Sequence, residues 1–68
     1  MNISDIVKVQ IHSNFSTPGR LKKIIDNDGL PVSYMVHVFA SGMDLVFYPE
    51  NVLEPTNEEL VLWKLQYS

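Results

Sequence analysis

Alternation of apolar and polar residues marks several short β-strands along this 68-residue chain. The clearest segment runs from Ile6 to His12, where Val7, Val9 and Ile11 fall on one face and polar residues fall on the other. This period of two residues is typical of a strand that is buried on one face. We therefore expect Val7, Val9 and Ile11 to point into a core.

The next segment predicts a loop followed by a bent strand. Residues 12–19 are rich in Ser, Asn, Thr, Pro and Gly, which favours a loop that ends at Gly19. A strand from Arg20 to Asp26 would place Leu21 and Ile24 on opposite faces if it were regular. We expect a bulge at Lys22-Lys23 that turns both apolar side chains into the core.

The middle of the chain predicts further strands that are separated by tight turns. In the fourth strand, an inward-facing pair Leu45 and Phe47 is favoured over Val46 and Tyr48. The predicted elements are a turn at Asn27-Asp28-Gly29 with Gly29 at positive φ, strands at Val32–Phe39 and Met43–Tyr48, one helical turn at Pro49–Val52, and a short strand at Leu53–Glu54.

The C-terminal segment predicts a helix with an unusual surface. Thr56 and Glu59 have the spacing of a capping box, and residues 57–67 contain no Gly or Pro. Apolar side chains occupy almost the whole circumference, with one stripe formed by Leu60, Trp63 and Tyr67. Two interpretations stay open: the helix covers the end of its own barrel, or its second face docks on a partner or on a second copy.

These elements predict a single, mostly β domain. It is a small five-stranded barrel over about residues 5–55, with a short C-terminal α-helix over about residues 57–67. The chain resembles the SH3-like (Src-homology-3-like) barrels of the KOW type. The resemblance rests on Asp5-Ile6-Val7-Lys8-Val9, the run Gly19 to Ile24, Tyr34-x-Val36-x-Val38, and Phe47 with the ending Pro49 to Pro55.

The resemblance implies an SH3-like barrel of the sort found in short bacterial and phage proteins of uncharacterised function. KOW-type modules of ribosomal and transcription factors tend to be basic, whereas this chain is acidic. Barrels that bind proline-rich peptides have an acidic, aromatic first loop, whereas the first loop here holds only Phe15 and no acid. Neither family function therefore transfers with the fold.

Composition indicates which cellular compartment and which class of partner to expect. The chain has no cysteine, which favours a reducing compartment, and its N-terminus lacks the basic and apolar regions of a signal peptide. No apolar stretch approaches the length that spans a membrane, so we expect a cytoplasmic protein. The net charge of −3 disfavours general affinity for nucleic acid.

Residues that could perform catalysis are sparse. His12 and His37 are the only histidines, both are expected on outward strand faces, and no thiol is available to complete a metal site. Asp26 and Asp28 flank the predicted turn, where such residues are needed for the turn itself. The sequence has no glycine-rich phosphate loop. We therefore expect no enzyme, no metal and no cofactor.

The leading hypothesis is a non-catalytic protein-interaction module that binds a protein partner or pairs with itself. Trp and Tyr are enriched at binding hot spots. The residues expected at the interface are Phe15, Phe39, Leu62, Trp63 and Tyr67.

Two alternatives use charge. Lys8, Arg20, Lys22 and Lys23 would bind nucleic acid if they shared one face, although such residues more commonly form a solvated strand face. A weaker alternative is an acidic inhibitor that mimics phosphate groups, for which the scattered carboxylates would have to converge in space.

Overall fold

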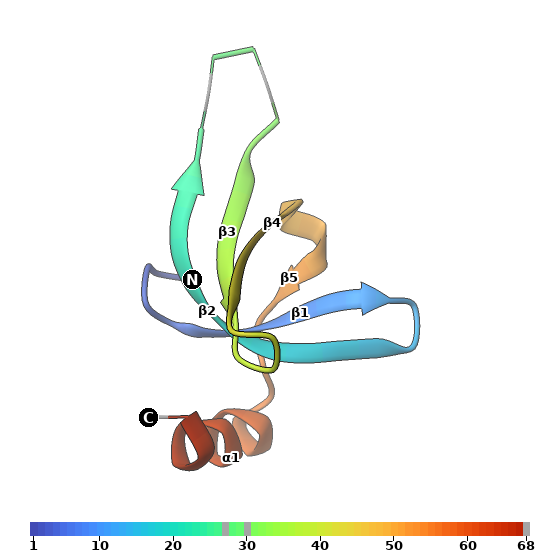
Figure 1. Ribbon diagram of the computed structural model, residues 1–68, viewed down its shortest axis with the longest axis vertical. Coiled ribbons are helices and arrows are strands. Elements are labelled where there is room, and N and C mark those ends of the chain that lie inside the picture. The colour runs from blue at the N-terminus through green and yellow to red at the C-terminus, as the bar shows by residue number, and fades with distance from the viewer. Residues whose placement is uncertain (27, 30, 68) are drawn as a thin grey trace.

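The computed structural model describes residues 1–26, 28–29 and 31–67 and has one sheet and one helix (Figure 1). The prediction of a mostly β fold with a C-terminal helix is confirmed. In chain order, the elements are β1 (Ile6–His12), β2 (Phe15–Ile25), β3 (Ser33–Val38), β4 (Met43–Phe47), a 3₁₀ turn (Pro49–Asn51), β5 (Val52–Leu53) and α1 (Asn57–Tyr67).

The five strands form an antiparallel sheet in the order β4-β3-β2-β1-β5. The sheet is not closed, because no pairing joins β4 to β5 among the residues that the structure describes. The long strand β2 connects its two halves: residues 15–20 pair with β1, and residues 19–25 pair with β3. Figure 1 shows β2 bending between these two partners, so that the sheet curves around its core.

The core lies on the inner face of this curved sheet. Its buried members come from four strands and are Val7, Val9, Leu21, Val36 and Val52, with Tyr34 and Phe47 packed against them. Val7 and Val9 thus point inward as predicted. The prediction for Ile11 is wrong: this side chain is exposed, because the β1–β2 register shifts between Gln10 and His12 and β5 covers only Lys8 and Val9.

The predicted loop over residues 12–19 is also wrong, because β2 begins at Phe15 and only Ser13-Asn14 turns the chain. Pro18 and Gly19 lie inside the strand. Pro18 has no N–H to donate, but its carbonyl accepts a hydrogen bond from the Phe39 N–H at 3.3 Å. Gly19 is required where β2 and β3 approach closely, so both residues signal contact between strands here rather than a turn.

The predicted bulge is confirmed, but it does not bury both of the apolar side chains that were expected in the core. Leu21 pairs with Val36 and Lys23 pairs with Met35, which leaves Lys22 as the extra residue. Leu21 is fully buried, but Ile24 is 43% exposed. The pairing of β2 with β1 ends at Arg20. Ile24 lies beyond this point, where β1 no longer flanks β2.

The remaining elements follow the sequence closely. Gly29 has the expected positive φ of 77°, whereas Asn27 of the same predicted turn lies outside the described residues. In β4, Phe47 packs against the core as predicted, and Leu45 is paired with the buried Val36. The predicted helical turn is the 3₁₀ turn, the predicted fifth strand begins one residue earlier at Val52, and the helix covers the predicted residues 57–67.

Candidate functional site

A capping box fixes the start of α1, and an ion pair connects this first turn to β1. The Thr56 N–H donates to Glu59 Oε1 at 2.9 Å, and the Glu59 N–H donates to Thr56 Oγ1 at 3.2 Å. The Lys8 ammonium of β1 binds the same Glu59 oxygen at 3.1 Å. Local sequence therefore starts the helix, and an ion pair with β1 orients its first turn.

The helix divides into two faces. Leu60, Trp63 and Tyr67 are half-buried, and they are the stripe that the sequence predicts. The other side carries Val61, Leu62 and Leu65, which are 62%, 59% and 82% exposed. These three side chains, which we call the outer face of α1, border a shallow groove of about 450 Å³ together with Asn57 and Glu58.

Aromatic residues hold the other end of the helix against the sheet. The Tyr67 and Phe39 rings stack with centroids 4.4 Å apart and planes 9° apart. The His37 and Phe39 rings form a T-shaped pair with centroids 5.9 Å apart, and the Arg20 guanidinium carbon lies 5.7 Å from the Phe39 centroid. Phe39 and Tyr67, both predicted to bind a partner, thus contact each other within one chain.

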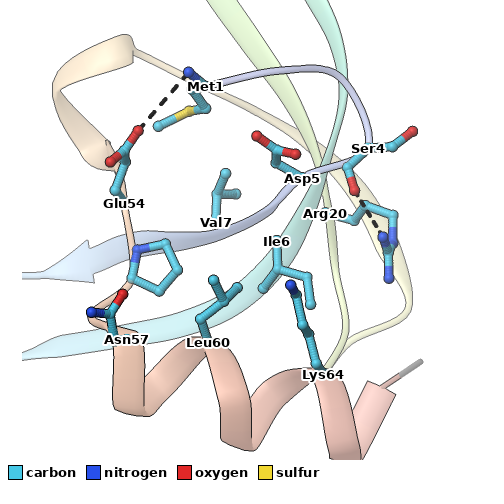
Figure 2. A pocket seen from close by; sticks show the side chains of 11 residues that line it. Met1, Ser4, Asp5, Ile6, Val7, Arg20, Glu54, Asn57, Leu60 and Lys64 are labelled. Atoms are coloured by element: carbon cyan, nitrogen blue, oxygen red, sulfur yellow. Dashed lines mark hydrogen bonds and ion pairs between the residues drawn. The ribbon is translucent and has the colours of Figure 1, made fainter.

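A cleft of about 490 Å³ lies between the N-terminal segment and α1 (Figure 2). Its volume is in the range of small-molecule sites. Apolar side chains such as Ile6 and Leu60 face it from β1 and from the helix, and charged groups of both signs surround them. The lining residues are Met1, Ser4, Asp5, Ile6, Val7, Arg20, Glu54, Pro55, Asn57, Leu60 and Lys64.

Two interactions tie the sides of this cleft together. Arg20 Nη1 donates to the Ser4 carbonyl oxygen at 2.8 Å, and the Met1 amine lies 3.9 Å from Glu54 Oε1. None of the lining residues, all in the described part of the chain, is a histidine. The cleft therefore combines an apolar floor with charged groups, of which Arg20 and Glu54 already contact other groups of the same chain.

Neither histidine lines this cleft. His37 Nδ1 and Asp44 Oδ1 are 2.7 Å apart on neighbouring strands. His12 is exposed at the end of β1, and β2 separates that strand from β3. Across residues 1–26, 28–29 and 31–67, no group of three or more His, Asp and Glu side chains is arranged to hold a metal ion.

The four predicted nucleic-acid residues have different surroundings. Lys8 is paired with Glu59, and Arg20 is bound to the Ser4 carbonyl. Only Lys22 and Lys23 are exposed neighbours, at the bulge in β2. Affinity for nucleic acid stays a prediction, with Lys8 and Arg20 already bound to oxygen atoms of this chain.

Of the five predicted partner-binding residues, Leu62 alone lies on the outer face of α1. Trp63 and Tyr67 are half-buried on the opposite stripe, Phe39 stacks on Tyr67, and Phe15 is exposed at the start of β2 next to the β1–β2 turn. Val61 and Leu65 were not among the residues predicted at the interface, although their spacing with Leu62 marks a second apolar face.

Comparisons with protein-family models, with curated proteins and with solved structures found no match to this chain. Within the described residues, no helix has the length and apolar character needed to cross a membrane.

Proposed function

We propose that this protein is a non-catalytic interaction module that docks on a partner protein through the outer face of α1. The observation that carries the proposal is the exposure of Val61, Leu62 and Leu65 on one side of a helix whose opposite side is already packed. A helix that only covers its own sheet keeps that second face polar. Three adjacent aliphatic side chains in water instead favour a surface that is buried in a complex.

The chemistry around the outer face indicates the kind of partner. Glu58 and Asn57 border the groove at the start of the helix, and the chain as a whole has a net charge of −3. An apolar surface with an acidic border is complementary to an amphipathic helix whose apolar stripe is flanked by Lys or Arg. We infer that the partner presents such a helix.

The expected complex is weak. Burying one aliphatic side chain contributes roughly 1.5–3 kcal/mol, and association costs several kcal/mol of lost translational and rotational freedom. The outer face of one helix is also smaller than a standard interface of about 1,600 Å². A transient complex is therefore the expected mode.

The fold that we infer for this module is SH3-like. Support comes from the antiparallel order β4-β3-β2-β1-β5, the bent second strand and the 3₁₀ turn before β5. We further propose a cytoplasmic location and a bacterial or phage origin, as the composition and the resemblance imply.

A pair of model peptides tests the function. Both are amphipathic helices with the same leucine stripe, one flanked by lysines and the other by glutamates. We expect the lysine peptide to bind more tightly, and Leu65→Ser to weaken its binding roughly 10- to 150-fold, since a buried leucine side chain contributes roughly 1.5–3 kcal/mol. Titration calorimetry gives both affinities.

Phe15→Ser is the matched control, because Phe15 is also an exposed apolar side chain but lies on β2, outside the outer face of α1, so this proposal no longer assigns it to the interface. Its affinity should equal that of the unmodified protein. Equal binding of the two peptides, or equal losses for Leu65→Ser and Phe15→Ser, would contradict the proposal.

A further inference from the structure

The two edges of the sheet differ in how well they are protected. β5 has only two residues and is followed closely by Pro55, which cannot donate a backbone hydrogen bond. β4 has five residues, and its only strand neighbour among the described residues is β3. The outward-facing N–H and C=O groups of β4 therefore form the longer unpaired edge of this sheet.

The side chains of β4 do little to protect this edge. Natural edge strands usually carry Lys, Pro or an inward-pointing charge. β4 reads Met-Asp-Leu-Val-Phe, and its single charge, Asp44, is held by His37 of its own sheet at 2.7 Å. Met43 and Val46 are each 54% exposed, and Leu45 is 37% exposed. The edge thus offers both free backbone groups and uncovered apolar surface.

We propose that β4 pairs antiparallel with β4 of a second copy of this chain, which joins the two sheets into one. A two-fold axis through Leu45 pairs all five residues of each strand. Leu45 then faces Leu45 of the other copy, Met43 faces Phe47, and Asp44 faces Val46. No like charges face each other in this register, because Asp44 lies opposite a valine.

The same register continues the apolar rows of each core. Within one chain, Leu21, Val36 and Leu45 lie side by side on β2, β3 and β4. Pairing at Leu45 extends this row into the row of the second copy, so side chains that now border solvent gain a packed neighbour. A partner of unrelated sequence would not match both the rows and the charge pattern, whereas a second copy matches them by symmetry.

Pairing of five residues buries far less than the roughly 1,600 Å² of a standard interface. The dimer is therefore expected at high micromolar to about millimolar concentration. It uses β4 and leaves the outer face of α1 open, so this inference does not rest on the proposed function, and either can fail without the other.

A charge swap at one position tests the pairing and its register. Val46→Glu places a carboxylate opposite Asp44 of the second copy, whereas Val46→Lys places an ammonium there. Two such contacts per dimer are expected to change the dissociation constant by roughly two- to thirtyfold, upward for the glutamate and downward for the lysine. Sedimentation equilibrium of the full chain over about 10 µM to 1 mM measures both constants.

The two variants control for each other, because each loses the same valine and any shared damage to the fold affects both. Val61→Glu, on the outer face of α1, should leave the dissociation constant unchanged. A protein that stays monomeric throughout this concentration range would overturn the proposal. A dimer that is abolished by Val61→Glu, or that weakens equally with both charges at position 46, would also overturn it.

Discussion

At Gly19, the β2 backbone passes so close to β3 that no side chain fits between the two strands. A Cβ atom at this position would lie 2.5 Å from Val36 Cγ1 and 2.9 Å from the His37 carbonyl oxygen. Carbon atoms pack at about 3.5–4.0 Å, so the strands would have to separate to admit it. The glycine therefore permits the close crossing at which β2 turns from β1 to β3.

Gly19→Ala is expected to lower the free energy of unfolding by about 1–3 kcal/mol, because the added methyl group overpacks a rigid crossing. Urea unfolding followed by circular dichroism measures the change. Ser16→Ala in the exposed first part of the same strand is the control and should change stability by less than about 0.5 kcal/mol. Equal stabilities of the two variants would show that β2 and β3 can separate at Gly19 without lowering the free energy of unfolding.

Among the elements, those fixed by local signals were predicted from the sequence. The alternation of residues 6–12, the extra residue near Lys22 and the capping box at Thr56 each act within a few residues, and each was found in place. The prediction of a loop over residues 12–19 was wrong because Pro18 and Gly19 contact the β3 segment, which is distant in sequence. Local composition does not reveal such a contact.

The candidate site also combines features set by local sequence with features set by contacts between distant segments. The stripe of Leu60, Trp63 and Tyr67 follows from helical periodicity alone. Which stripe packs inward depends on Phe39, which is distant in sequence and stacks on Tyr67. The cleft beside Arg20 likewise combines the N-terminal segment with the helix, so no single stretch of sequence signals it.

The start of α1 should respond to pH through Glu59. Hydrogen bonds from the Thr56 backbone and from Lys8 hold the pKa of the Glu59 carboxyl below its ordinary value of 4.5. Because the pKa is lower in the folded state, this stabilisation is complete above the ordinary value and is lost as the pH falls through the lowered one. Glu59→Gln should therefore flatten the loss of stability on acidification.

Urea unfolding at a series of pH values between about 7 and 3 measures this effect. The other carboxyl groups are the same in both proteins, so the difference between the two curves isolates Glu59. The glutamine can still accept the Thr56 N–H, which preserves the helix start. Parallel curves for the two proteins would contradict a role of Glu59 in the acid response.

For the molecule as a whole, the core is small and the exposed apolar surface is large. Within the described residues, the buried cluster consists of four valines and Leu21, while the outer face of α1 and the β4 edge both remain in water. A chain of this size hides only about 60% of its unfolded surface. The proposed contacts would therefore add to its stability as well as to its function.

Leu21→Ala tests how far stability depends on this core. Leu21 is fully buried between β1 and β3, and removing it leaves a cavity that typically costs about 2–5 kcal/mol. For a domain of this size, the midpoint of thermal unfolding should fall by roughly 10–30 °C. Leu65→Ala removes the same atoms from an 82% exposed side chain and should change stability by less than about 0.5 kcal/mol. Calorimetry that found similar losses for both would mean that α1 contributes to the core through Leu65, and the outer face would then not be available for a partner.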